Sequence, residues 1–241
     1  MKTSFNDNDS PEQGQDPGTQ EVMDPKSDPM LPSTKREHSI DIGELKWSRL
    51  NVFNASSKYR IEGAVEGDIV LEKEIRVIPA RQKCPLVVLA RQKRFKEDIP
   101  YGSQEVPQTF ETWESAQRYF NEQENPYPII PYCDVAGLLK WDKETSPVSE
   151  NDMAAAFPFE AGDDRYALVQ YTVQKKRAVD ENYARIRTIE LANGGLWKKF
   201  VNVYSTSKSY AGNEWWQFMI APTGVPVPDS TLTFIQQLME L

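Results

Sequence analysis

The predicted fold depends on two stretches, YALVQYTVQ at residues 166–174 and ARIRTIEL at residues 184–191. The first is rich in β-branched and aromatic residues, which is typical of a strand, and in the second apolar positions alternate with polar ones, as in a half-buried strand. Arg185 and Arg187 then share one face of the second strand. Asn193-Gly194-Gly195 follows it, and this triplet is typical of a hairpin turn. We therefore expect paired strands in this half of the chain.

The flanking sequence adds more strands and two helices. Strand-like segments occupy residues 59–62, 68–78, 86–89, 196–204 and 214–220. Thr109 is placed to N-cap a helix that runs to about Glu124. A final helix carries its apolar side chains on one stripe, which either packs on its own domain or contacts a partner. The chain is thus expected to be a β-rich α+β protein with inserted helices and a C-terminal amphipathic helix.

Composition suggests three parts, one of which has an insertion. Residues 1–37 are rich in Asp, Ser, Pro, Gln and Gly and poor in large apolar residues. Such a segment cannot bury enough apolar surface to order itself, so we expect a disordered acidic N-terminal arm. Residues 38–228 form the β-rich domain, with a helical and acidic insertion at about 98–164, and residues 229–241 form the terminal helix. The arm either competes for a basic groove or only confers solubility.

Charge is unevenly distributed along the chain. The chain has 28 Lys and Arg against 36 Asp and Glu, a net charge of −8. Two basic windows stand out: residues 81–96 hold six bases and no acid, and residues 165–210 hold nine bases and three acids. Residues 97–164, between them, hold fifteen acids and three bases. Because binding of a polyanion depends on the local field, an acidic protein can still carry a basic groove. The alternative is that both windows are solvated strand faces.

Aromatic residues lie within or beside both basic windows. A protein that binds single-stranded nucleic acid requires cations along the path of the phosphates and flat side chains on which bases stack. The expected phosphate contacts are Arg91, Lys93, Arg94, Lys175, Lys176, Arg177, Arg185, Arg187, Lys198 and Lys199. The expected stacking residues, each of which could instead belong to the core, are Phe95, Tyr171, Tyr183, Trp197, and Trp215 or Trp216. Because Trp215 and Trp216 are consecutive on a strand, one of them must face away from the core.

The sequence lacks the residues that several kinds of catalytic site require. His38 is the only histidine, which leaves a Ser-His-Asp or Cys-His site without a base and argues against zinc. Glycine motifs that cradle nucleotides are also absent from the sequence. Two sets of acidic residues could hold magnesium as in a nuclease: Asp163 with Asp164, and Asp68 with Glu72 and Glu74. A turn explains the first set more simply, and the solvated face of a strand explains the second. We expect no enzyme activity and no cofactor.

Cys84 and Cys133 are far apart in the sequence and form no CxxC motif. Without an export signal they are expected to be reduced and buried, with one disulfide as the alternative. The longest apolar run, residues 85–90, is far shorter than a membrane helix requires, and the N-terminus lacks a secretory signal. We therefore expect a cytoplasmic protein, in the host cytoplasm if it is viral, with no membrane partner.

Four segments of the chain resemble the single-stranded-DNA-binding proteins of bacteriophages. They are Gly67-Asp68-Ile69-Val70-Leu71, Asp98-Ile99-Pro100-Tyr101-Gly102-Ser103, the strand pair from Tyr166 to Arg187, and the hairpin from Trp197 to Trp216. The resemblance implies an OB-fold-like antiparallel barrel or sheet, an acidic tail and no catalytic motif. Here the acidic tail is N-terminal, whereas in that family it is usually C-terminal, where it recruits replication partners.

The expected function is sequence-independent binding of single-stranded DNA in phage-type DNA replication or recombination. Expected partners are single-stranded DNA and replication or recombination proteins, and a homo-oligomer is compatible with the sequence. The first alternative is a structural or assembly module, such as a virion component, that binds other proteins and no nucleic acid. The acidic middle segment and the terminal helix favour that alternative. The second alternative is the metal-dependent nuclease.

Overall fold

The computed structural model describes residues 46–239 except residues 55, 101, 211 and 212. All of these residues belong to one compact unit, His38–Leu241. The expected acidic arm over residues 1–37, the single histidine and the start of the ordered domain lie outside the described residues.

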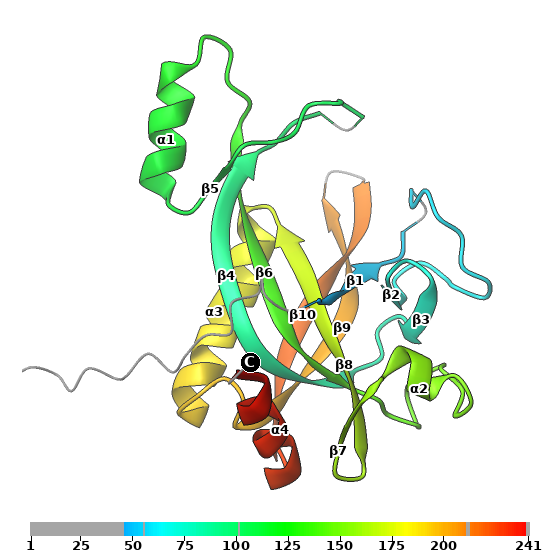
Figure 1. Cartoon of the computed structure of the whole chain (residues 1–241). Coiled ribbons are helices and arrows are strands. Elements are labelled where there is room, and N and C mark those ends of the chain that lie inside the picture. Colours follow the sequence, from blue (N-terminus) through cyan, green and yellow to red (C-terminus); the bar gives the residue numbers. More distant parts are fainter. Residues whose placement is uncertain (1–45, 55, 101, 211–212, 240–241) are drawn as a thin grey trace, which may run out of the picture. The chain divides into compact units, whose positions relative to one another are not determined.

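The described residues contain ten strands and four helices, joined by loops. The strands are β1 (Ser48–Val52), β2 (Ile69–Leu71), β3 (Ile75–Ile78), β4 (Cys84–Glu97), β5 (Thr109–Phe110), β6 (Ile129–Lys140), β7 (Phe159–Ala161), β8 (Asp164–Gln174), β9 (Lys199–Tyr210) and β10 (Asn213–Pro226). The helices are α1 (Trp113–Glu122), α2 (Met153–Ala156), α3 (Lys176–Asn193) and α4 (Asp229–Met239). The predicted β-rich α+β class is confirmed (Figure 1).

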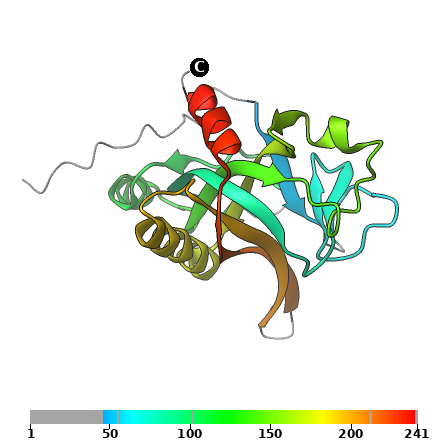
Figure 2. The ribbon, with the colours of Figure 1, turned by 90° about the horizontal axis from the view of Figure 1, so that it is seen from below.

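All ten strands belong to one sheet, which curls into an open half-barrel (Figures 1 and 2). Its order is β10-β9-β4-β6-β8-β1-β2-β3, with β5 paired to β4 and β7 paired to β8. The long strands β4 and β6 pair from Leu86 with Leu139 to Glu97 with Ile129, and β8 continues the sheet on the other side of β6. The described pairs are antiparallel except for β1 with β8, which is parallel.

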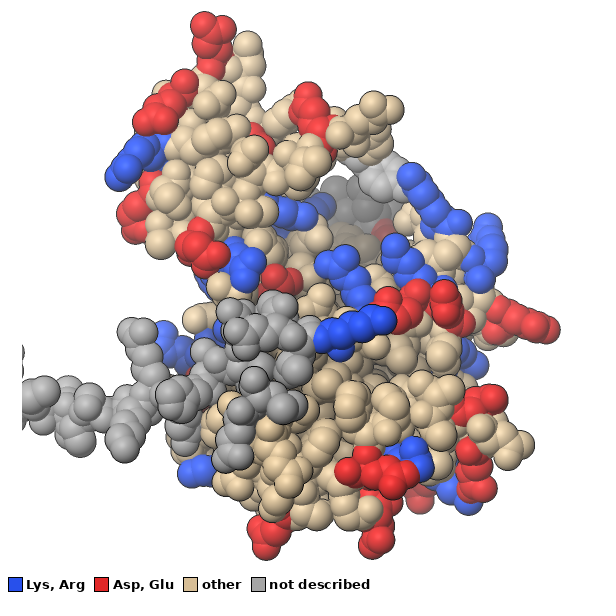
Figure 3. Space-filling view, in the orientation of Figure 1, with Lys and Arg blue, Asp and Glu red and all other residues tan. Residues whose placement is uncertain are grey.

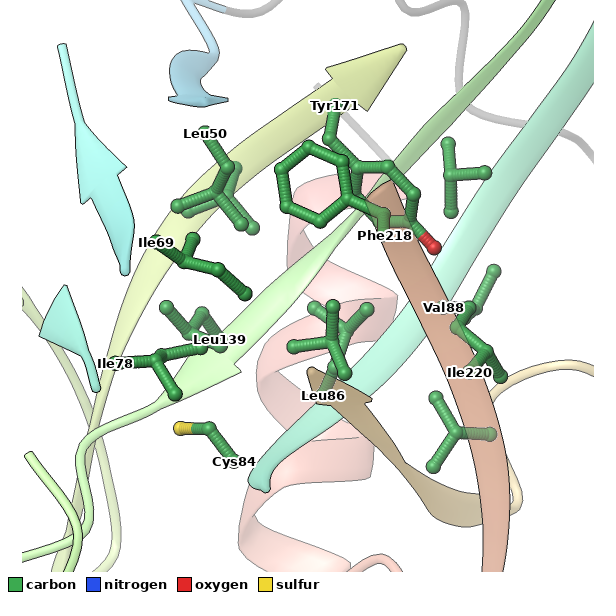
Figure 4. Packing of buried hydrophobic residues seen from close by; sticks show 14 of the residues in the cluster. Leu50, Ile69, Ile78, Cys84, Leu86, Val88, Leu139, Tyr171, Phe218 and Ile220 are labelled. Carbon is green, nitrogen blue, oxygen red and sulfur yellow. The ribbon is translucent and has the colours of Figure 1, made fainter. Parts of the chain in front are cut away.

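The curl brings strands from both ends of the sheet order into one core. Ile69 of β2 and Ile220 of β10, both fully buried, belong to the same cluster of apolar side chains (Figure 4). Leu86 and Leu139, from the middle of the sheet, belong to it as well, and α3 packs into it through its buried side. Burying one such side chain contributes about 1.5–3 kcal/mol. This shared core therefore stabilises the curvature of the sheet as well as the strands themselves.

The opposite face of the sheet carries a second core, which α4 covers. Ile235 and Leu238 of α4 pack there with Trp47 and with side chains of β4, β6 and β8. A hydrogen bond joins Tyr166 Oη of β8 to Thr231 Oγ1 of α4 at 2.9 Å. The predicted C-terminal helix is confirmed, and its apolar stripe packs on its own domain.

The strand expected over residues 184–191 is wrong, because these residues lie in helix α3. The buried positions of α3 are spaced by one, three or four residues, as on one side of a helix: Ala178, Val179, Asn182, Ile186 and Ile189. The β-branched residues of this stretch favoured a strand, but packing against the sheet overrides that preference. Leu191, which the strand interpretation gives as the alternative to Ile189 for an inward position, is 74 % exposed. Gly194, at φ +66°, ends the helix in the left-handed conformation, so Asn193-Gly194-Gly195 is a helix C-cap and not a hairpin turn.

Other segments also differ from expectation. Residues 98–164 are not an insertion as a whole, because they include β6, which lies between β4 and β8 in the middle of the sheet. Helix α1 begins later than expected: its N-cap is Thr112 rather than Thr109, and the Thr112 hydroxyl accepts a hydrogen bond from the Ser115 main-chain N–H at 3.2 Å. Residues 59–62 form no strand.

Candidate nucleic-acid interface

A groove of about 1160 Å³ opens where β1 and β8 part. The two strands pair at only two positions, Ser48 with Val169 and Arg49 with Gln170. One wall of the groove is β1 with the loop that follows it, and the other is the end of β8 with the first turns of α3. The β9–β10 hairpin lines the groove between these walls. Figure 3 shows several Lys and Arg side chains around a hollow in one face of the molecule, with Asp and Glu side chains beside some of them.

The groove is positively charged although the whole chain is acidic. Four cations line it against one acid, Glu181; they are Arg49, Lys175, Arg177 and Lys208. Glu181 forms ion pairs with Arg177, at 3.2 Å from Nε, and with Lys208, at 3.7 Å from Nζ. Within the part of the chain that the structure describes, the side chains of Arg49 and Lys175 have no ion-pair partner. Unpaired cations on two facing walls produce a local field that attracts a polyanion.

Lys175 holds an unusual main-chain conformation at the rim of the groove. Its φ of +72° lies in a region that residues other than glycine rarely adopt. Hydrogen bonds hold it there: its N–H donates to Pro131 O at 3.1 Å, and its carbonyl accepts from the Val179 N–H at 3.0 Å. Such strain costs about 1–3 kcal/mol and persists only where the surrounding structure imposes it. The turn from β8 into α3 therefore places an exposed cation at the groove.

The two consecutive tryptophans of β10 both line the groove but differ in their surroundings. Trp216 lies against Gly67, where an added Cβ would come within 2.5 Å of the indole ring, and the Arg81 guanidinium lies 5.4 Å from the centroid of the same ring. Trp215 is 42 % exposed. The expectation that one of the pair faces away from the core is confirmed, and Trp215 is the ring available for stacking. Tyr59, on the wall that follows β1, adds a second aromatic side chain.

Asp68 anchors the loop that follows β1. Its carboxylate is fully buried and accepts hydrogen bonds from the main-chain N–H groups of Val65, at 2.8 Å, and Ala80, at 2.7 Å. It also pairs with Arg76 Nε at 2.6 Å. Hydrogen bonds and an ion pair on both of its oxygens are what a buried carboxylate requires. Asp68 therefore has a structural role in the groove wall.

Two of the other carboxylates considered for magnesium, Glu72 and Asp164, are engaged as well. Glu72 accepts the Arg49 main-chain N–H at 2.6 Å, and Asp164 pairs with Lys140 at 2.8 Å. Among the described residues, no three side chains of metal-binding type lie together. The structure thus offers no preformed metal centre in this part of the chain.

Only some of the predicted DNA-binding residues line the groove. Those that line it are Lys175, Arg177, Trp215 and Trp216. Tyr171 is fully buried with its ring centroid 4.5 Å from that of Phe218, so it supports the groove from beneath and cannot stack on a base. Lys176 is exposed, outside the lining, and pairs with Asp180 at 3.1 Å.

Three groove residues had no clear signal in the sequence. Arg49 lies on β1, Tyr59 lies in the loop that follows, and Lys208 lies near the end of β9. Lys208 falls within the second basic window, but nothing in its neighbours sets it apart. Pairing between strands that are distant in sequence brings these three side chains to one groove.

Four of the six bases of the first basic window lie on β4, and two of these four form ion pairs with acids of α3. Arg91 Nη2 lies 2.6 Å from Glu190 Oε2, and its guanidinium lies 4.3 Å from the centroid of the Tyr183 ring. Burial alone would lower the pKa of Arg91, but the hydrogen bond and charge of Glu190, together with Tyr183, raise it. Lys93 pairs with Asp180 at 3.2 Å. These cations join the sheet to the helix and do not form a free surface for phosphates.

Arg94 and Phe95 contact a projecting lobe, residues 97–128, which contains β5 and α1 (Figure 1). Arg94 Nε lies 3.4 Å from Glu111 Oε1. The Phe95 ring packs against Trp113 of α1, with 5.5 Å between centroids. Both residues therefore hold the lobe on the end of β4 rather than facing the groove.

Because residues 176–193 form a helix, the cations of the second basic window do not lie together on paired strands. Helix α3 rises about 1.5 Å per residue, so its two ends are roughly 25 Å apart. Lys198 and Lys199 follow its C-terminal end, whereas Lys175 precedes its N-terminal end. Trp197 packs against the second core, on the α4 side of the sheet. The helix thus separates residues that a hairpin would have placed side by side.

The two arginines expected on one strand face have different environments on α3. Arg185 Nη1 donates to the main-chain carbonyl of Ile220 on β10, at 3.3 Å. Arg187 is exposed and does not line the groove. Neither residue therefore belongs to the site.

Both cysteines are free and buried, as expected. Burial raises the pKa of the Cys133 thiol to about 12, and it raises the pKa of Cys84 far above that of an ordinary thiol. The Cys84 thiol donates to Lys140 O at 3.2 Å. A thiol that stays protonated at neutral pH is a poor nucleophile, so these two cysteines are structural.

Comparisons with family models, with curated proteins and with solved structures found no match. The resemblance to bacteriophage single-stranded-DNA-binding proteins stays a prediction. Among the described residues, no helix is both long and apolar enough to cross a membrane.

Proposed function

We propose that this protein binds single-stranded DNA without sequence preference, in the groove between β1 and β8. The observation that carries the proposal is an exposed indole, Trp215, in one groove with the unpaired cations Arg49 and Lys175. The cations would contact phosphates while bases stack on the exposed ring. Stacking of this kind contributes about 1–3 kcal/mol per base and accepts any base. The cellular role would be phage-type DNA replication or recombination in the cytoplasm, without catalysis, as the sequence resemblance implies.

The groove favours a single strand over a duplex for a physical reason. In a duplex the face of each base is already stacked on its neighbours, so an aromatic side chain reaches it only after the base is extruded. Trp215 lies on a strand of the sheet, 42 % exposed, and offers a ring to bases that are already unpaired. Positive charge alone would attract both forms, so the tryptophan supports the choice of the single strand.

Fluorescence anisotropy with a labelled single strand, a duplex and a single-stranded RNA tests this proposal. A strand of about 30 nucleotides exceeds the ~4–16 nucleotides that one OB fold covers. We expect tight binding to the single-stranded DNA, weaker binding to the duplex, and an affinity that falls steeply with salt. No binding to the DNA at low salt would refute the proposal, and tighter binding to the RNA would reassign the ligand.

A pair of charge variants tests the location of the site. Arg49→Gln with Lys175→Gln removes the two unpaired cations of the groove, and Arg187→Gln with Lys198→Gln removes two exposed cations outside its lining. Because each phosphate contact on a single strand contributes about 0.7 to the salt slope, the groove variant should lower that slope by about 1.4. The control variant should leave it nearly unchanged. Equal effects in the two variants would show that DNA binds elsewhere.

A second candidate function, binding to another protein, is favoured by the lobe. Residues 97–128 hold seven acids and one base. Trp113 and Phe120 lie seven residues apart on one face of α1, and they are 46 % and 37 % exposed. Exposed aromatic side chains among charged ones are typical of a protein interface. A stable oligomer in light scattering that Trp113→Ala dissociates, without salt-dependent DNA binding, would select this function.

A further inference from the structure

One carboxylate lies among the cations of the groove. Glu181 is the single acid among the described residues that line it, and its side chain is 28 % exposed. Its two oxygens face different cations: Oε1 lies 3.2 Å from Arg177 Nε, and Oε2 lies 3.7 Å from Lys208 Nζ. Arg177 precedes it by one turn of α3, whereas Lys208 lies on β9. The carboxylate therefore bridges two elements that line the groove.

The chemistry of this bridge matches that of a phosphodiester. A carboxylate and a phosphodiester each present two oxygens that share one negative charge, and Arg and Lys bind both. The Arg177 side chain is 89 % exposed and that of Lys208 is 36 % exposed, so both can be reached from the groove. Ion pairs this exposed are weak, and another anion can displace them.

We infer that Arg177 and Lys208 form a phosphate-binding pair and that Glu181 occupies it until a DNA phosphate displaces the carboxylate. This inference rests on the proposed function and assigns one phosphate position to it. Glu181 then has two effects: it holds the two cations in place while the groove is empty, and it reduces the affinity of the groove for DNA. Removing its charge should therefore strengthen binding, which is the opposite of what loss of a DNA contact would do.

Asp180, the preceding residue, provides a matched control. It also pairs with two cations, Lys176 at 3.1 Å and Lys93 at 3.2 Å, but it does not line the groove. Glu181→Gln and Asp180→Asn each remove one negative charge from the same turn of α3. A difference between the two variants therefore reports on position in the groove and not on net charge.

The test compares the affinity of both variants for the labelled single strand at two salt concentrations. We expect Glu181→Gln to bind about fivefold more tightly at low salt, the effect of one partly exposed ion pair, and Asp180→Asn to change affinity less than about twofold. The salt slope of Glu181→Gln should steepen by up to about 0.7, because a cation pair freed of its carboxylate releases more counterions. In a Lys208→Met background the gain should shrink, since Glu181 then holds one cation instead of two.

The outcomes separate this inference from the proposed function. If the wild type binds the single strand and the two variants behave alike, or if Glu181→Gln binds more weakly, the displacement model is overturned and the DNA groove stands. If the wild type does not bind, both fail. A thermal unfolding curve of each variant shows whether a changed affinity reflects a changed fold.

Discussion

The side-chain amide of Asn182 on α3 donates a hydrogen bond to the main-chain carbonyl of Phe218 on β10, at 3.1 Å. β10 is the last strand of the sheet order, so this carbonyl belongs to an edge that no further strand of the described residues covers. Arg185 donates to Ile220 O two residues along the same strand. Helix α3 therefore caps the edge of the half-barrel with side chains. This explains why Arg185, expected at the DNA, is engaged in the fold instead.

Asn182→Ala should lower the free energy of unfolding by about 1–3 kcal/mol, because it leaves a buried carbonyl without its donor. Asn182 is fully buried, and its Nδ2 also donates to Ala178 O at 3.0 Å. Urea unfolding followed by circular dichroism measures the loss. Asn121→Ala, at an exposed position of α1, is the control and should change stability by less than about 0.5 kcal/mol. Equal effects would mean that the edge needs no such cap.

Alanine substitutions at two glycines of the loop after β1 distinguish the stability cost of backbone strain from that of steric contact. Gly63, at φ +70°, has nothing within 4 Å of an added Cβ, whereas at Gly67, at φ +92°, that atom would meet the Trp216 ring at 2.5 Å. Gly63→Ala should cost about 1–2 kcal/mol from the left-handed backbone alone. Gly67→Ala should cost about 1–3 kcal/mol more, because the loop must move away from the indole. Thermal unfolding compares the two, and equal costs would contradict the tight contact.

Trp215→Ala should weaken single-strand binding roughly 5- to 150-fold, since stacking on one base contributes about 1–3 kcal/mol. Trp113→Ala is the matched control, because both indoles are similarly exposed and only Trp215 lines the groove. Anisotropy titrations measure both affinities, and quenching of tryptophan fluorescence by DNA should be reduced only in Trp215→Ala. A loss of affinity in Trp113→Ala of the same size would move the site toward the lobe.

Stability should fall as pH rises above about 9, where an ordinary thiol ionises. Burial raises the pKa of Cys133 to about 12 in the folded protein, from 9.0 for an ordinary thiol. Between these values the unfolded chain has released the proton and the folded chain keeps it, so rising pH favours unfolding. Urea unfolding at a pH of about 8 and of about 10 measures the decline. Cys133→Ala should make the decline shallower, and an unchanged slope would assign it to other buried groups, such as Cys84 and Tyr171.

Local periodicity and composition were sufficient for much of the fold. The strand-like composition of residues 166–174 predicted β8, and the apolar run around Leu86 predicted the core of β4. The stripe of the terminal helix predicted α4, and the consecutive tryptophans predicted one exposed ring. Each of these signals depends on residues a few positions apart, so no knowledge of distant contacts was needed.

The tertiary structure decided the rest, because the deciding contacts join distant parts of the chain. Residues 184–191 have strand-like composition, yet they are helical since Ile186 and Ile189 pack into the curl of the sheet. Arg91 is a cation in the sequence, and Glu190 neutralises it across 99 positions of the chain. The groove exists only where β1 and β8 part, and it brings Arg49 to the same site as Lys208. The sequence alone determined which charges and rings the protein has, whereas long-range packing decided which of them remain free.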